Sequence, residues 1–345
     1  MDPLTTKVVV VIPIPNDPDW TIFEELSEAV PIIVCDDSDG KLSPAPRKNV
    51  RFFDYAAQER IMGKHYAAIP HKSAACRNFG HFLAYKEGFD VIIALDYDCR
   101  TRAGWLEEHL RALGPMAQAP AVAGRWINTV EQPGFYARGF PYEYRNADST
   151  MTDTAVSGEV KLNMGVWDNV LDLNGIDKIQ REPPKTPGLR GDTNYVALGM
   201  VPLCGMNTAF RAELTPAYFF LPDVWIGGWQ LSRHDDIWGG YILKRLMDKR
   251  GDLLAYGRPV VEHTRQSNLH RVITIEHYMH LMAREFYAIV DAAMEAIRPG
   301  AYAEMFAAFV DAYRREVDRS AAPLHYRQGY RELGESMQRW AAAFR

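Results

Sequence analysis

Residues 90–98 read Asp-Val-Ile-Ile-Ala-Leu-Asp-Tyr-Asp, an apolar run that ends in two carboxylates, Asp96 and Asp98. A continuous apolar run of this length predicts a strand buried on both faces, as in a parallel sheet. The carboxyl end of such a strand opens onto the ligand crevice of an α/β fold, and residues i and i+2 point the same way. Two carboxylates in one crevice suit Mg²⁺ or Mn²⁺, and such a cation suits a diphosphate. The alternative is that the two aspartates are ordinary turn residues.

Strand and helix patterns alternate on both sides of this run. Apolar runs predict three further strands, at residues 7–12, 31–36 and 50–53. Helical patterns cover residues 20–30, 73–87 and 236–250. This alternation predicts an α/β fold with a mixed, mainly parallel sheet flanked by helices.

The middle and the end of the chain differ in amino-acid composition and in the structure that it predicts. Residues 128–194 are rich in Gly, Pro, Asn and Asp, which predicts loops over a site. From residue 275 onward apolar residues recur at helical spacing. We therefore expect a catalytic domain over residues 1–274 and a C-terminal helical extension over 275–345. The apolar faces of the extension suit packing on the catalytic domain or on another subunit, so a homo-oligomer is a further expectation.

Composition excludes several classes of function. The 345 residues include 39 basic and 44 acidic side chains, well mixed and with a net charge of -5, which predicts no nucleic-acid or membrane surface. Apolar runs stay far below the roughly 20 residues of a spanning helix, and the N-terminus lacks the pattern of a signal peptide. The four cysteines show no CxxC spacing, so we expect reduced thiols in a cytoplasmic protein.

Two further groups of residues are candidates for binding a nucleotide. Asp36 and Asp37 follow an apolar strand, where carboxylates can bind a base N–H or ribose hydroxyls, although an Asx turn explains them equally well. Lys72 and Arg77 flank the start of a helix with Ser73 as its expected N-cap. Cations are unfavourable at that end of a helix, and a bound phosphate would remove the conflict. The alternative is two solvated side chains.

Asp235 and Asp236 open the helix expected over 236–250. Capping and the helix dipole can explain both residues. In the functional interpretation, one carboxylate faces a sugar as a base or as an electrostatic partner of an oxocarbenium-like centre.

His263 follows a short apolar strand at residues 259–261. It could complete a metal shell with Asp96 and Asp98, with Glu262 as the alternative ligand and a structural role as the plain alternative.

Residues 139–145 read Gly-Phe-Pro-Tyr-Glu-Tyr-Arg and gather aromatic side chains around Arg145. Such a cluster is most often packing with a stacked guanidinium. Beside a sugar-binding site it could equally form a platform for the substrate.

Six blocks of this sequence, in order and with similar spacing, resemble the reversibly glycosylated polypeptides, also called UDP-arabinopyranose mutases. The blocks lie at residues 71–80, 95–99, 139–145, 202–210, 233–238 and 263–268. The resemblance covers about residues 7 to 280. It implies a GT-A-like fold, as in nucleotide-diphospho-sugar transferases, that binds a UDP-sugar with Mn²⁺ or Mg²⁺. It also implies interconversion of the pyranose and furanose forms of UDP-arabinose.

The resemblance extends to individual residues. Family members become glycosylated on an arginine of the Gly-[Tyr/Phe]-Pro block, which corresponds to Arg145. Asn207, in the fourth block, becomes a candidate for binding the nucleotide sugar. The family's acidic motif has three aspartates, and here Tyr97 replaces the central one.

A mechanism follows as a hypothesis. The cation on the two aspartates makes UDP a better leaving group, and Lys72 and Arg77 add positive charge near the diphosphate. Arg145 traps the sugar while the ring opens and recloses, and Asp235, Asp236 or Glu143 takes the proton of the guanidinium. One alternative is a metal-dependent glycosyltransferase with a separate acceptor, whose site the divergent residues 148–192 could build. Another is a partner protein that binds a nucleotide sugar without turnover.

Overall fold

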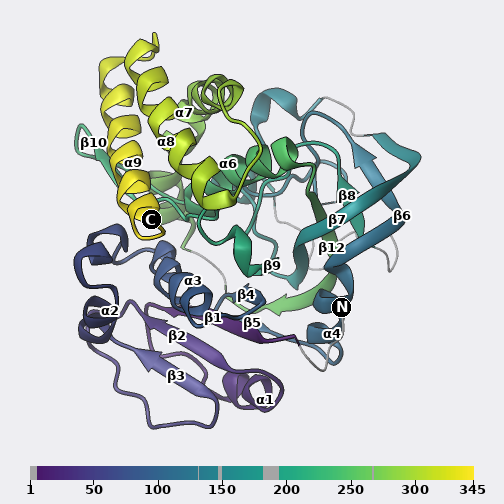
Figure 1. Ribbon diagram of the computed structural model, residues 1–345, viewed down its shortest axis with the longest axis vertical. Coiled ribbons are helices and arrows are strands. Elements are labelled where there is room, and N and C mark those ends of the chain that lie inside the picture. The colour runs from purple at the N-terminus through teal and green to yellow at the C-terminus, as the bar shows by residue number, and fades with distance from the viewer. Residues whose placement is uncertain (1–5, 131, 147–149, 182–193, 266–267) are drawn as a thin grey trace.

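A ten-stranded sheet runs through the protein, with helices on its faces (Figure 1). The computed structural model describes residues 6–130, 132–146, 150–181, 194–265 and 268–345. The strands of this sheet are β1 (Val8–Ile14), β2 (Ile32–Asp36), β3 (Val50–Phe53), β4 (Val91–Leu95), β5 (Cys99–Arg100), β6 (Gly114–Ala123), β7 (Thr150–Asn169), β8 (Tyr195–Ala197), β9 (Asn207–Arg211) and β12 (Leu253–His263). A separate two-stranded hairpin is formed by β10 (Val224–Ile226) and β11 (Trp229–Leu231).

One half of the large sheet is parallel, in the order β3-β2-β1-β4. Every residue of β2 and β4 is buried, as continuous apolar runs predict for strands covered on both faces. Because β1, β2 and β4 run in the same direction, their carboxyl ends meet at one edge of the sheet. Asp36 ends β2 at that edge, and Asp96 follows directly after β4. The strand prediction for residues 90–98 is therefore confirmed.

The other half of the sheet is mixed, in the order β9-β7-β6-β8-β12-β5. β7 lies at its centre and is 20 residues long, so the prediction of loops over residues 128–194 was wrong for this segment. Buried polar residues interrupt its apolar pattern: the Lys161 ammonium pairs with Glu213, and Asn163 donates to the Arg258 carbonyl. Those partners come from distant segments, so the local sequence does not reveal the strand. The mixed α/β sheet itself is confirmed, and it is consistent with a nucleotide-sugar transferase fold.

Helices cover the sheet and form the C-terminal part of the chain. They are α1 (Thr21–Ala29), α2 (Tyr55–Met62), α3 (Arg77–Lys86), α4 (Trp105–Ala112), α5 (Gly175–Gln180), α6 (Asp235–Arg250), α7 (Leu269–Glu295), α8 (Tyr302–Arg319) and α9 (Leu324–Ala342). Helix α3 packs closely on β1, because a Cβ atom added at Gly80 would lie 2.4 Å from Val11 Cγ1. This close packing holds the start of α3 beside the carboxyl edge of the sheet.

The C-terminal helices α7, α8 and α9 lie together at the end of the molecule opposite β2 and β3 (Figure 1). They pack on the rest of their own chain, because one apolar cluster includes both β1 and α9. The Trp340 ring stacks on Phe219 with centroids 5.1 Å apart, and its Nε1 donates to the Pro216 carbonyl. The expected boundary at residues 274 and 275 falls inside α7, which begins at Leu269.

We expect Trp340→Ala to lower the free energy of unfolding by about 3–5 kcal/mol, because the ring is fully buried between α9 and the segment that contains Pro216 and Phe219. Chemical denaturation followed by circular dichroism measures this loss. Trp225→Ala is the matched control, since that ring is 62% exposed and its removal should change stability by less than about 0.5 kcal/mol. Equal effects of the two substitutions would contradict the anchoring role of Trp340.

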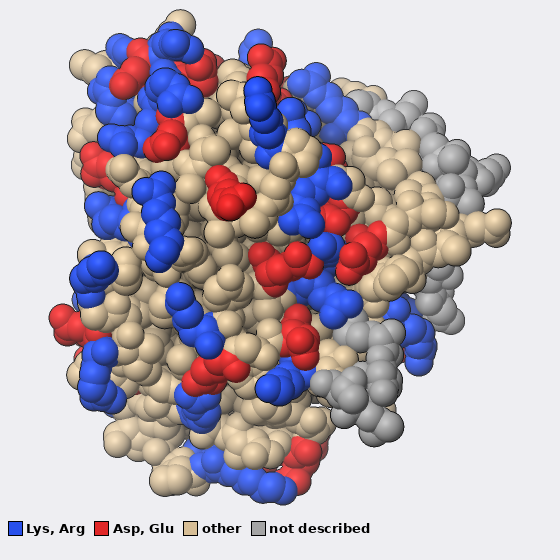
Figure 2. Space-filling model, in the orientation of Figure 1, with Lys and Arg blue, Asp and Glu red and all other residues tan. Residues whose placement is uncertain are grey.

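Acidic and basic side chains are interspersed over the face shown in Figure 2, as their even mixture in the sequence suggests. In the part of the chain that the structure describes, every helix is too short or too polar to cross a membrane.

Candidate functional site

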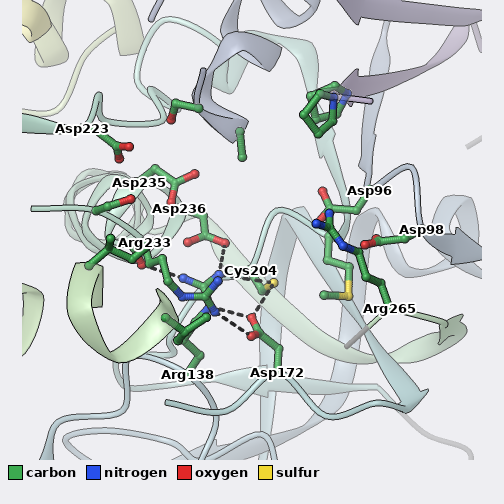
Figure 3. A pocket seen from close by; sticks show the side chains of 18 of the residues that line it. Asp96, Asp98, Arg138, Asp172, Cys204, Asp223, Arg233, Asp235, Asp236 and Arg265 are labelled. Atoms are coloured by element: carbon green, nitrogen blue, oxygen red, sulfur yellow. Dashed lines mark hydrogen bonds and ion pairs between the residues drawn. The ribbon is translucent and has the colours of Figure 1, made fainter. Parts of the chain in front are cut away.

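A cavity of about 360 Å³ opens at the carboxyl edge of β1 and β4, and this volume is within the usual range of ligand sites. The starts of α6 and α7 and the hairpin strand β11 form the opposite wall. Basic side chains in the lining are Lys72, Arg77, Arg138, Arg233, Arg265 and Arg271. Acidic side chains are Asp37, Asp96, Asp98, Asp172, Asp223, Asp235 and Asp236. In Figure 3, Asp96 and Asp98 face the group around Arg138 and Asp235 across the cavity.

Arg77 orients the first aspartate of the acidic pair. Its Nη2 lies 2.5 Å from Asp96 Oδ1, its Nη1 donates to the Gly205 carbonyl, and only 2% of its side chain is exposed. Burial raises the pKa of Asp96, although Arg77 opposes this shift. Arg77 lines the cavity. Its guanidinium is buried and paired with Asp96, so it is not one of the solvated side chains that the sequence offered as the alternative.

Asp98 and His263 are brought together by a strand pairing. The end of β12 runs antiparallel to β5, which sets His263 opposite Cys99 and its Nε2 3.8 Å from Asp98 Oδ2. The Nδ1 of His263 is 2.7 Å from the Val170 carbonyl, so Nδ1 carries the hydrogen and Nε2 faces the aspartate. Burial lowers the pKa of His263, but Asp98, the Val170 carbonyl and Asp172 together raise it above its usual value. Glu262 is bonded to Asn169 and does not line the cavity.

The residues on this side fit a divalent cation. Asp98 Oδ1 is buried and has no hydrogen-bond partner in the part of the chain that the structure describes, so this carboxylate oxygen is free to bind a cation. Within the described ranges, no three His, Cys, Asp or Glu side chains are grouped closely enough to hold a metal ion by themselves. A cation on Asp96 and Asp98 would therefore take its other ligands from water and from substrate oxygens. Tyr97, between the two aspartates, bonds instead through its hydroxyl to Arg265 and Asn16.

Asp36 and Asp37 have separate roles. Asp36 Oδ1 accepts from Ser38 N at 2.9 Å, which is the Asx turn, and the residue does not line the cavity. Asp37 does line it, and accepts from the backbone N–H of Lys72 and the hydroxyl of Tyr55. Burial raises the pKa of Asp37 to about 6. The Lys72 ammonium is exposed at the cavity and lies 3.4 Å from Asp39.

Arg138 lies in the cavity wall and was missed by the sequence analysis. Its Nε lies 2.6 Å from Asp172 Oδ2, and its Nη2 lies 2.7 Å from Asp236 Oδ2 (Figure 3). Burial alone would raise the pKa of Asp172, but Arg138 and Arg233 together lower it well below its usual range. The guanidinium is therefore held between two carboxylates. Its only sequence signal was its position directly before the block at residues 139–145.

Arg145 lies outside the cavity lining. Its two Nη atoms make a bidentate pair with Asp177 at 2.8 and 2.6 Å, and its guanidinium lies over the rings of Tyr142 and Tyr136. Glu143 is exposed and also lies outside the lining. The structure thus places Arg145 in the stacked packing cluster that the sequence offered as an alternative, outside the residues that line the cavity.

Asp235 and Asp236 are the first two residues of α6, and both line the cavity. Neither side chain caps the helix, whose N-cap residue is His234. Asp236 is bound by Arg138 and by the Gly205 N–H. Burial and the neighbouring Asp236 raise the pKa of Asp235 to about 7. Asp236 therefore fixes an arginine, whereas Asp235 can hold a proton near neutral pH.

Asn207 lies in the interior and not in the cavity lining. Its Oδ1 accepts from Trp105 Nε1 and lies 2.9 Å from His109 Nε2. Its Nδ2 donates to the carbonyls of Val166 and Pro259. These bonds join α4, β7, β9 and β12, so the protein itself uses the side chain that we expected to bind the nucleotide sugar.

We expect Asn207→Ala to reduce the free energy of unfolding by at least about 2 kcal/mol, because it leaves several buried polar groups without partners. The affinity for UDP, measured by titration calorimetry below the melting temperature, should stay within threefold of the parent value. A stable variant that has lost UDP binding would instead place Asn207 in the ligand site.

Comparison with known proteins shows the family to which the chain belongs. The profile of the family described as "Reversibly glycosylated polypeptide" matches residues 7–344. The chain belongs to this family. Among the reversibly glycosylated polypeptides and their relatives, it is similar to UDP-arabinopyranose mutase 1 of Arabidopsis thaliana, with 28% identity over 257 residues, which are 69% of this chain and 65% of that protein.

Two other relatives are matched over longer regions. UDP-arabinopyranose mutase 3 of Arabidopsis thaliana is 27% identical over 285 residues, and UDP-arabinopyranose mutase 1 of Oryza sativa subsp. japonica is 26% identical over 284 residues. Each match covers 77% of this chain and 72% of the relative. The family resemblance inferred from the six blocks is therefore confirmed.

Proposed function

We propose that this protein is a UDP-sugar mutase that interconverts the pyranose and furanose forms of a UDP-pentose of the UDP-arabinose type. The single observation that carries the proposal is the cavity in which a fixed guanidinium, Arg138, faces the acidic pair Asp96 and Asp98. The names of the relatives support the choice of reaction and substrate.

The cavity has an end suited to each part of the substrate. Pro13, Pro15 and Asp37 lie where β1 and β2 end, and we assign the nucleoside to this end. Mn²⁺ or Mg²⁺ would be held by Asp96 and Asp98, with His263 beside them, and would make UDP a better leaving group. Lys72 and Arg265 add positive charge around the diphosphate. The sugar then lies toward Arg138 and Asp235.

Arg138, in place of Arg145, is the arginine that we propose takes up the sugar. The C1–O bond to UDP breaks with its electrons on UDP, and a guanidinium nitrogen of Arg138 bonds to C1. A guanidinium is a poor nucleophile because its pKa lies above 12, so a carboxylate must accept its proton. Asp236 at 2.7 Å and Asp172 at 2.6 Å are both placed to do so. UDP later attacks C1 and releases the arginine.

Transfer of the sugar to a separate acceptor is the second candidate. Trp225 is 62% exposed on the β10–β11 hairpin and pairs with Gln230, which lines the cavity. An exposed ring beside the cavity could support an acceptor sugar. Part of the divergent segment that we associated with an acceptor, residues 148–192, lies outside the described ranges, namely residues 148–149 and 182–192, as do Gln266 and Ser267 of the last block.

One experiment separates these functions. The protein is incubated with UDP-arabinopyranose and Mn²⁺, alongside a panel of other UDP-sugars, and the products are separated by chromatography. A furanose product supports the mutase, whereas free UDP that appears only with an added acceptor supports the transferase. Absence of both products with measurable UDP binding would indicate a binding partner and would overturn the proposal.

We also propose a reducing compartment such as the cytoplasm, supported by four buried free cysteines. Homo-oligomerisation stays a prediction from the sequence.

A further inference from the structure

Five carboxylates on or near the Arg77 and Arg138 side of the cavity differ in their ion-pair partners. Asp96 pairs with Arg77, and Asp172 and Asp236 both pair with Arg138. Asp223 and Asp235 line the cavity without an ion pair to any Lys or Arg in the described part of the chain. Figure 3 shows Asp223 on the same side of the cavity as Asp235 and Asp236.

Asp223 is held in place by neutral donors. Its Oδ2 accepts from Gln230 Nε2 at 2.8 Å, and Ser232 donates a second hydrogen bond. Leu221 N donates to the Asp235 carbonyl, which ties the segment before Asp223 to the start of α6. The two carboxylates are therefore fixed on one wall by two different elements.

Burial is the main reason that both groups can hold a proton near neutral pH. Burial raises the pKa of Asp223 to about 6, with Arg271 of α7 the opposing charge. Burial, Asp236 and Asp223 raise the pKa of Asp235 to about 7, against the opposing charges of Arg138 and Arg77. Between these values one carboxylate is ionised and the other is protonated, which is the state of a carboxyl pair that can both donate and accept.

We propose that Asp223 and Asp235 form a proton-exchanging pair for the sugar ring, an inference that rests on the proposed mutase function. Asp223 is thereby assigned as a further catalytic residue. It touches the sugar from the wall opposite the acidic pair Asp96 and Asp98.

The proton balance of the reaction requires such a pair. When the pyranose opens, the C1–O5 bond breaks with its electrons on O5, and O5 takes a proton from the protonated carboxyl. The bonded nitrogen of Arg138 supplies electrons to C1 in the open form. When the furanose closes, O4 attacks C1 and its proton passes to the ionised carboxylate. One proton leaves the pair and one returns, so no outside acid or base is consumed.

The test compares Asp223→Asn, Asp235→Asn and a control, Asp311→Asn, whose side chain is exposed on α8. We expect each of the first two to lower kcat by about 10²–10³-fold and leave the affinity for UDP with Mn²⁺ within threefold. The control should keep full turnover. In the wild type kcat should fall below about pH 6 and above about pH 7. Asp223→Asn should remove the acid limb and Asp235→Asn the alkaline limb.

Two additional measurements separate chemistry from folding. Formate should restore part of the turnover of Asp223→Ala, which a purely structural role would not allow. Carboxyl ¹³C NMR of the full chain should show the two groups titrating between about pH 5.5 and 7.5, whether or not a UDP-pentose is turned over. Turnover of Asp223→Asn within threefold of wild type, or ordinary acidic titration of both groups, would overturn the pair. A wild type that binds UDP but converts no UDP-pentose would overturn the proposed function instead.

Discussion

Arg138→Lys should lower the turnover of UDP-arabinopyranose at least about 10³-fold while the protein still folds. Lysine keeps the positive charge between Asp172 and Asp236 but loses the planar fork that contacts both carboxylates and the nitrogen that we propose bonds to C1. Chromatographic assays give the rate, and mass spectrometry of the intact protein after incubation with the UDP-sugar should show the sugar adduct only in the parent chain.

Arg145→Lys is the matched control, seven residues along the chain from Arg138. Its guanidinium makes a bidentate pair and stacks on two tyrosines outside the cavity. We expect this variant to lose about 1–3 kcal/mol of stability and to keep turnover within threefold at a temperature where it is folded. Loss of the adduct in Arg145→Lys, with retention in Arg138→Lys, would reverse the assignment of the two arginines.

Chelation of divalent cations should abolish turnover, and Asp98→Asn should lower it at least about 10²-fold. The reason is the buried Oδ1 of Asp98, which has no hydrogen-bond partner among the described residues; the substitution turns this carboxylate into a neutral amide. Added Mn²⁺ should restore the chelated parent protein fully, whereas Asp98→Asn should need a much higher Mn²⁺ concentration for half-maximal rate.

Asp90→Asn is a suitable control for the metal experiment, because Asp90 precedes the other end of the same strand and its carboxylate binds the Lys7 N–H. An amide oxygen can accept that bond equally well, so turnover should stay near the parent value. Full turnover of thoroughly chelated parent protein would contradict a cation on Asp96 and Asp98.

Some strands and cavity residues of this protein could be predicted from the sequence, and others could not. β4 was predicted correctly because it is apolar throughout and buried on both faces, so its environment is visible in its own residues. β7 was missed because Lys161 and Asn163 are buried with partners from other segments. For the site, three candidates from the sequence, Asp37, Arg77 and Asp235, line a common cavity. Asp172 and Asp223 carried no signal, since each is a single aspartate whose neighbours come from elsewhere in the fold.

The sequence by itself determined the family, the α/β class and the edge of the sheet at which the cavity lies, because apolar runs and the carboxylates that end them are local patterns. Only the tertiary structure showed that Arg138 lines the cavity and that Arg145 does not. The two residues carry the same guanidinium, and their ion-pair partners set their positions: Asp172 and Asp236 lie 34 and 98 residues from Arg138, and Asp177 lies 32 residues from Arg145. Electrostatic pairing acts through space, so which arginine faces the cavity depends on contacts that form only when distant segments fold together.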